Sequence, residues 1–330
     1  MMRFVCPAVR RLSAIAVALA LAVVSQPAAA TGNYPTKPVR IVVPFGASGV
    51  GDLTVRIIAD KLGRKLGGHF YVENRPGAGG IIAARTVLSS PPDGSTLALL
   101  SNGTAVSVSL FAQLRYDPLR DFVPISSLGL FDFILATGRD SKFKTLADFI
   151  AGAKAKPGVL NVGTINAGST QNLAAELLKT AAGIDFTIVP YGASPDLLVS
   201  TMQGNLALMI DSYSAMQGNL ADGKLRALAS TGPVRSQATP DIPTVKESGV
   251  AGYEVVSWNG LFARAGTPPE IVKTLNSALQ DILSESDVKH QLLKLGIEAK
   301  ASTPEEIEAR LKSDIGKWHN VIEKAGIQKQ

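Results

Sequence analysis

The chain has 330 residues, a formal net charge of +6 and a single cysteine, Cys6, which lies in an N-terminal segment that we expect to be removed. The rest of the chain then has no thiol for a disulfide bond, a nucleophile or a cysteine-containing metal site. Its basic residues are interspersed with acidic ones, as in 305–324, which argues against a nucleic-acid partner.

Residues 1–30 have the features of a secretory signal peptide. Arginines precede an apolar stretch, 12–24, that is too short to span a bilayer. The sequence Ala28-Ala29-Ala30 fits a small-residue cleavage site, so we predict cleavage after Ala30 and a protein located in the periplasm. The remaining chain is long enough for two domains with separate cores.

The first part of the mature chain alternates short apolar runs with longer amphipathic ones. Strands are expected at 39–45, 70–73 and 96–101, with helices at 53–66 and 81–89 between them. Such a succession predicts βαβ crossovers and a mainly parallel sheet.

A glycine-containing loop, 45–52, joins the first strand to the first helix. Gly46, Gly49 and Gly51 allow close backbone approach or positive φ. Backbone N–H groups and the positive end of the helix dipole then point at one place, which suits an anion. We expect five residues of this loop to contact a ligand: Phe45, Gly46, Ala47, Ser48 and Gly49.

Asp52 and the spacing of the glycines limit what this loop can bind. Asp52 would repel an anion, so we expect it to cap the helix and pair with Arg56. A dinucleotide-binding turn is disfavoured because the glycines run G-x-x-G-x-G rather than G-x-G-x-x-G and Pro44 interrupts the strand.

The alternation of strands and helices continues toward the C-terminus. One strand-like run after Phe131 lies within the connecting segment 125–137, and a β-rich stretch lies at 253–262. Further strands are expected at 160–163, 186–189, 206–210 and 225–229, and helices at 169–182, 194–203, 214–221, 269–283, 287–295 and 304–325.

This order predicts two α/β lobes, the first from 31–133 together with 257–330 and the second from 134–256. A chain that crosses twice between its lobes forms a clamshell with a two-stranded hinge. Ligand pockets favour such inter-domain clefts.

The second lobe repeats the geometry of the first loop. Asn166, Gly168, Ser169 and Thr170 follow an expected strand and open the next helix. Helix capping by Ser169 or Thr170 would explain this segment by itself, but two openings in facing lobes favour a ligand held between them. Other polar residues at strand ends join the predicted site, although turn chemistry explains each one singly: Asn102, Thr104, Tyr191 and Asp211.

Catalysis finds little support in the sequence. His69, His290 and His319 are expected on the surface. The chain has neither a G-x-S-x-G nor an H-E-x-x-H motif, so we predict a protein that is not an enzyme and has no metal site or cofactor.

Several motifs in their order along the chain resemble one family. They include Val-Glu-Asn-Arg-Pro-Gly-Ala-Gly-Gly at 72–80, Gly168-Ser169, Pro190-Tyr191 and Gly-Thr-Pro at 266–268. The chain resembles the extracytoplasmic substrate-binding proteins of tripartite tricarboxylate transporters, the TctC or Bug type. Asn172 stands where that family often has a histidine.

The resemblance implies a two-lobed periplasmic binding protein of the type II-like, Venus-flytrap kind. It implies a small carboxylate ligand, held largely by backbone amides and waters from 45–49 and 166–170. Delivery to the membrane permease subunits of a tripartite tricarboxylate transporter is then expected, and the protein is expected to be a monomer. The alternative is a periplasmic partner that presents its ligand to a membrane sensor kinase; a secreted hydrolase is a more distant third.

Overall fold

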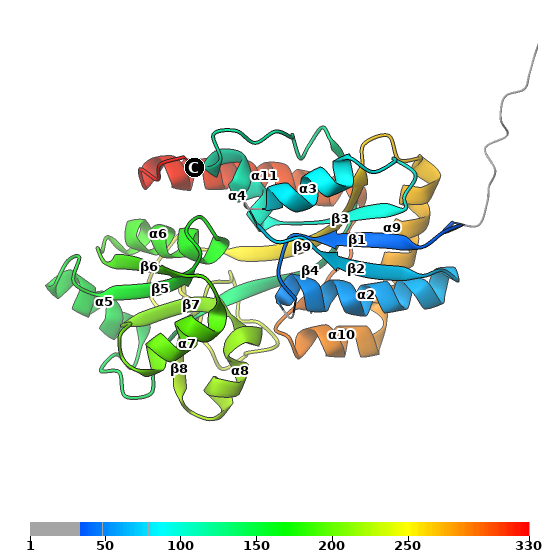
Figure 1. Ribbon diagram of the computed structural model, residues 1–330. Helices are drawn as coiled ribbons and strands as arrows, with labels where there is room; N and C mark the ends of the chain where they lie inside the picture. The colour runs from blue at the N-terminus through cyan, green and yellow to red at the C-terminus, as the bar shows by residue number, and fades with distance from the viewer. Residues whose placement is uncertain (1–33, 48, 78–79, 330) are drawn as a thin grey trace, which may run out of the picture.

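The computed structural model describes residues 34–47, 49–77 and 80–329. The predicted signal peptide and Ser48 lie outside these residues. Within them the chain forms a mixed α/β structure whose strands belong to one ten-stranded sheet, with helices on both of its faces (Figure 1).

One half of the sheet has the strand order β2-β1-β3-β9-β4. β1 is parallel to both β2 and β3, as the βαβ pattern predicted, whereas β9 runs antiparallel between β3 and β4. The strands of this half, apart from β4, are β1 (Val39–Val43), β2 (Phe70–Asn74), β3 (Thr96–Ser101), β9 (Val256–Arg264) and the short β10 (Glu298–Ala299).

The other half continues from β4 through β7 and β5 to β6. β5 is parallel to β6 and β7, while β4 is antiparallel to both β7 and β8. Its strands besides β4 are β5 (Asn161–Ile165), β6 (Thr187–Tyr191), β7 (Leu208–Ser212) and β8 (Leu225–Ser230). The sheet is therefore mixed, and the prediction of a mainly parallel sheet was wrong because the two strands that join the halves run antiparallel to their neighbours.

The 17-residue strand β4 (Phe122–Gly138) belongs to both halves. It pairs with β9 up to Asp132 and with β7 from Phe133 onward. Asp132 lies opposite Val256, where the chain returns along β9. Two adjacent strands thus carry the chain between the halves, as the clamshell prediction required.

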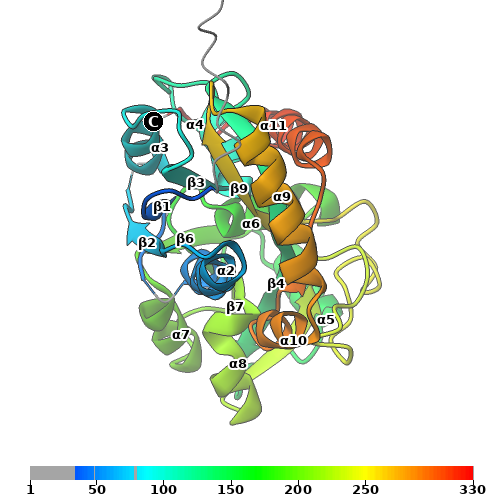
Figure 2. The ribbon, with the colours of Figure 1, turned by 90° about the vertical axis from the view of Figure 1, so that its right-hand side faces the viewer.

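Ten helices cover the described sheet. Figure 2 shows α9 lying beside α2 on one face of the first half, and the two helices share a buried core. The opposite face carries α3, α4 and α11 (Figure 1). The helices are α2 (Val50–Leu66), α3 (Ile81–Leu88), α4 (Asn102–Leu110), α5 (Leu146–Ala155), α6 (Thr170–Ala182), α7 (Ser194–Met202), α8 (Tyr213–Ala221), α9 (Pro269–Ser284), α10 (Ser286–Leu293) and α11 (Pro304–Lys324).

One apolar core extends across both halves of the sheet. It includes Leu110 of α4, Leu173 of α6 and Leu311 of α11. α6 belongs to the second half, but its Leu173 shares this core with α4 and α11 of the first half, and α6 contacts both of these helices. This packing places the predicted opening of α6 at the boundary between the halves.

None of the helices in the described part of the chain is long and apolar enough to span a membrane.

Candidate functional site

The predicted site residues of both halves follow the carboxyl ends of strands. β1 and β3 are parallel and paired, so the loop that starts at Pro44 and the residue Asn102 lie at one edge of the sheet. Asn102 donates a hydrogen bond from Nδ2 to Oγ1 of Thr170, the first residue of α6, over 3.3 Å. This bond joins the two halves and places two predicted site residues, Asn102 and Thr170, next to each other.

The opening of α6 is held by its own polar side chains. The hydroxyl of Ser169 accepts the N–H of Asn172 over 3.1 Å and donates to the carbonyl of Ile165. The side chain of Asn172 in turn accepts the N–H of Gly168 over 3.1 Å. Ser169 is therefore the N-cap residue, one of the two candidates that the sequence offered.

These bonds decide which amides of the segment are left for a ligand. The N–H of Gly168 is bonded to Asn172, and the N–H of Ser169 donates to the carbonyl of Asn166 over 3.0 Å. Thr170 and Gln171 occupy the first two helical positions, where a helix supplies no acceptor for the backbone N–H. These two amides are the donors that an anion at this helix end would meet.

The turn before α6 requires its glycine. Gly168 has φ of 75°, and a Cβ there would lie 2.1 Å from Cδ2 of Leu110 in α4. Asn166 also has a positive φ, 22°, which is uncommon outside glycine. The turn is thus shaped both by its own backbone and by close contact with α4.

The opening of α2 is built differently. Gly49 precedes the helix in an extended conformation, with φ of −77° and ψ of 166°, and has no side chain to cap it. Gly51 is needed for packing, since a Cβ there would lie 2.6 Å from the ring of Phe45. Gly46, Gly49 and Gly51 do not adopt positive φ. Close approach explains Gly51 alone, because a Cβ at Gly46 would meet nothing within 4 Å and one at Gly49 would make only an ordinary 3.6 Å contact with the carbonyl oxygen of Gly46.

Asp52 stabilises this loop through hydrogen bonds of its side chain. Its side chain is buried and accepts hydrogen bonds from Nε of Arg56 and from Nδ2 of Asn74, each over 2.9 Å. The same nitrogen of Asn74 also donates to the carbonyl of Phe45 over 3.0 Å. The Asp52–Arg56 ion pair predicted from the sequence is confirmed, while the part played by Asn74 was missed.

Asp211 is a second buried carboxylate, at the end of β7. Its Oδ1 accepts from Nε2 of Gln171 over 3.3 Å and from the N–H of Ser212 over 2.7 Å. Its Oδ2 is buried and has no hydrogen-bond partner among the described residues. Burial raises the pKa of Asp211, and the neighbouring Ser194 hydroxyl, the Ser212 amide and Gln171 oppose that rise.

Thr104 and Tyr191 make hydrogen bonds that stabilise local structure. Thr104 forms a capping box with Ser101 at the start of α4. The hydroxyl of Tyr191 is bonded to Ser200 over 2.6 Å, and its carbonyl accepts the N–H of Asn166 over 2.9 Å. A ligand role for these two residues stays a prediction.

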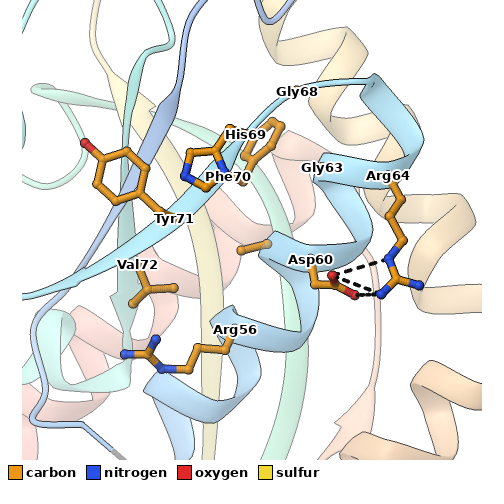
Figure 3. Close-up of a pocket in the computed structure, with 10 residues that line it drawn as sticks. Arg56, Asp60, Gly63, Arg64, Gly68, His69, Phe70, Tyr71 and Val72 are labelled. Atoms are coloured by element: carbon orange, nitrogen blue, oxygen red, sulfur yellow. Dashed lines mark hydrogen bonds and ion pairs between the residues drawn. The ribbon is translucent and has the colours of Figure 1, made fainter.

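Two hollows in the described part of the molecule lie away from these segments. One, of about 570 Å³, lies between α2 and β2 and is lined by Arg56, Arg64 and Tyr71 among others (Figure 3). Its charges are already neutralised, because Arg64 is paired with Asp60 and Arg56 with Asp52. The other, of about 480 Å³, lies near Phe143 and the end of α7. No cluster of three or more potential metal ligands occurs among the described residues.

Comparison with known proteins defines the class. A solved structure described as R. palustris Rpa4515 with adipate has a TM-score of 0.83 and 34% identity, covering 90% of this chain and all of that one. MatC from Rhodopseudomonas palustris, solved with bound malate, has a TM-score of 0.78 and 32% identity over 88% of this chain and all of MatC. A structure of the periplasmic binding protein BugD has a TM-score of 0.79 and 29% identity, over 90% of this chain and all of BugD. The fold is that of a periplasmic binding protein.

The family is shown by sequence as well. Residues 54–327 match the tripartite tricarboxylate transporter family receptor, TctC. Protein BugT of Bordetella pertussis is 31% identical over 319 residues, which cover 96% of this chain and 98% of BugT. The chain belongs to the TctC family of receptors, and the resemblance noted in the sequence is confirmed.

Proposed function

We propose that this protein is a periplasmic receptor that binds a small carboxylate between the openings of α2 and α6 and delivers it to a tripartite tricarboxylate permease. The observation that carries the proposal is the Asn102–Thr170 hydrogen bond, which brings strand ends of both sheet halves together. The family membership and the adipate and malate named for two relatives support a carboxylate as the ligand.

The chemistry of the two openings suits a carboxylate. Each offers backbone N–H groups at the positive end of a helix dipole, and neither the 45–49 loop nor the 166–170 segment contains a lysine or arginine. Hydrogen bonds to a charged group contribute about 1.5–3 kcal/mol each, so a few of them together reach micromolar affinity. Recognition through amides constrains the carboxylate group and tolerates variation in the rest of the acid.

The mechanism follows from the shared strands. The proposed lobes are residues 31–133 with 257–330, and residues 134–256, because β4 changes partner after Asp132 and β9 begins at Val256. Small changes in these two strands would open and close the lobes about the ligand, a motion of the hinge type. We infer that the protein binds and releases its ligand without converting it to a product.

A thermal-shift screen of carboxylic acids, followed by calorimetry, tests the ligand class. Adipate and malate are the first probes, and adipamide is the control that keeps the length of adipate but removes its charges. We expect at least one acid to raise the melting temperature and to bind with micromolar affinity, while adipamide does neither. An amide that binds as well as its acid, or a protein that binds no acid, would contradict the proposal.

Two further experiments address location and delivery. Mass spectrometry of the exported protein is expected to show an N-terminus at Thr31, next to the predicted cleavage site. Reconstitution with the permease is expected to make acid uptake depend on this protein. Signalling through a sensor kinase without uptake would favour the alternative.

A further inference from the structure

A chain of buried hydrogen bonds leads from the C-terminal helix to the opening of α6. Nε1 of Trp318 in α11 donates to Oδ1 of Asn102 over 2.7 Å, and Nδ2 of Asn102 donates to Oγ1 of Thr170 over 3.3 Å. The exposed fractions of Trp318, Asn102 and Thr170 are 1%, 0% and 6%. Bonds in such a dry environment hold their partners more firmly than bonds in water.

The chemistry of the three side chains fixes which group donates and which accepts in each of these hydrogen bonds. An indole N–H can only donate, so the carbonyl oxygen of the Asn102 side chain must face Trp318. The amide nitrogen of Asn102 must then face Thr170, whose hydroxyl oxygen acts as the acceptor. The hydroxyl proton of Thr170 is therefore directed away from Asn102. Among the described residues, this hydroxyl is bonded to no acceptor of its own.

We propose that Trp318 is a positioning residue for ligand binding, because it orients Asn102 and thereby makes the Thr170 hydroxyl a donor to the bound carboxylate. This inference rests on the proposed function. It adds a side-chain donor to the amides of Thr170 and Gln171 at the same helix end. It also explains why Asn102, predicted as a ligand contact, is fully buried: Asn102 acts through Thr170.

The packing around these residues supports a rigid arrangement. α11 packs against both α4 and α6, and Leu110 of α4 lies against the turn at Gly168. Without the indole N–H, the side-chain amide of Asn102 is free to turn over. Its carbonyl oxygen would then take the proton of Thr170, and the ligand would lose that donor.

The chain contains a matched control for this idea. Trp258 is the only other tryptophan, is also buried, and donates from Nε1 to Oδ2 of Asp314 over 2.7 Å. Trp318→Phe and Trp258→Phe each remove one buried indole hydrogen bond and keep an aromatic ring. Only the first bond leads to Thr170.

Calorimetric titration of adipate or malate, whichever the wild type binds, tests the proposal. We expect Trp318→Phe to weaken binding about tenfold, the effect of losing one hydrogen bond to a charged group. Trp258→Phe is expected to change the affinity less than twofold. Thermal unfolding of both variants checks that each is folded at the temperature of the titration.

A double-mutant cycle separates positioning from general damage. In a Thr170→Val background, Trp318→Phe is expected to have little further effect on affinity, because the hydroxyl through which it acts is gone. Thr170→Ser keeps the hydroxyl and is expected to bind within about threefold of the wild type. Equal losses from the two tryptophan variants, or additive losses in the cycle, would overturn the proposal. A wild type that binds no acid would overturn the proposed function as well, whereas normal binding by Trp318→Phe would overturn this inference alone.

Discussion

The openings of α6 and α2 are both proposed to bind the carboxylate, but they are stabilised in different ways. α6 is capped by Ser169, and its turn is fixed by Asn172 and by contact with α4. α2 begins after a glycine, and its loop is held from below through Asn74, which bonds the carbonyl of Phe45. At the α6 opening, the backbone amides of Gly168 and Ser169 donate hydrogen bonds that hold the turn in shape. In the α2 loop, by contrast, the stabilising bond from Asn74 goes to a carbonyl, that of Phe45. We therefore expect α6 to supply the rigid side of the proposed site and α2 the more adaptable side.

The largest expected effect comes from breaking the rigid side. Gly168→Val combines an unfavourable backbone conformation with a clash against Leu110, and we expect it to cost about 2–5 kcal/mol of stability. Affinity for the acid is expected to fall at least about 100-fold, because the amides of Thr170 and Gln171 are displaced. Urea unfolding and calorimetry measure the two quantities.

Gly183→Val is the control at the other end of α6. Gly183 also has positive φ, 59°, but a Cβ there meets nothing within 4 Å. We expect a loss of about 1–2 kcal/mol from the backbone alone and unchanged affinity. If both variants bind acid equally well, the turn at Gly168 is no part of the site.

Substitution of the buried Asp52 tests the more adaptable side of the site, the α2 loop. Asp52→Asn removes the charge that holds Arg56 and Asn74, and we expect it to cost about 1–3 kcal/mol and to weaken acid binding several-fold. Asp60→Asn on the same helix breaks an exposed pair with Arg64 of the same spacing, and is expected to change stability by less than about 0.5 kcal/mol. Equal effects from the two substitutions in unfolding experiments would show that Asp52 does not support the loop.

The smallest expected effect concerns Asp211, the buried carboxylate beside α6, which has no cationic partner among the described residues, whereas Asp52 is paired with Arg56. Its pKa is raised by burial, so the folded protein holds the proton more tightly than the unfolded chain. This contribution to stability is present below about pH 4 and is lost as the pH rises through the folded-state pKa.

Asp211→Asn removes that pH dependence. Its stability relative to the wild type is therefore expected to rise between pH 4 and pH 7, opposite in sign to the loss from Asp52→Asn at neutral pH. Urea unfolding at the two pH values gives the difference. A relative stability that stays constant or falls over this range would show that Asp211 is not held in the way described.

Local pattern was enough to predict much of this molecule. The strands β1–β3 and β5–β8 and most helices follow apolar runs and helical periodicity. The length of β4 was missed because Ser126, Ser127 and Gly129 interrupt its apolar character and two bulges break its register. α4 was missed because it is buried on most sides and shows no polar face.

The site could be predicted only in part for a related reason. A helix opening is visible in the sequence as an apolar strand followed by glycine and hydroxyl residues, and this pattern identified both loops. The support of each loop comes from residues distant in sequence, Asn74 for the first and Asn102 with Trp318 for the second. Nothing in the local sequence around Trp318 indicates that its indole reaches α4.

Amide chemical shifts of the labelled protein during titration with adipate or malate test the central claim most directly. We predict that amides at the start of α2 (Val50 and Gly51) and at the start of α6 (Thr170 and Gln171) shift together and report one common affinity. Shifts confined to one helix opening, or shifts centred on the hollow around Arg64 and Tyr71 in Figure 3, would contradict the account.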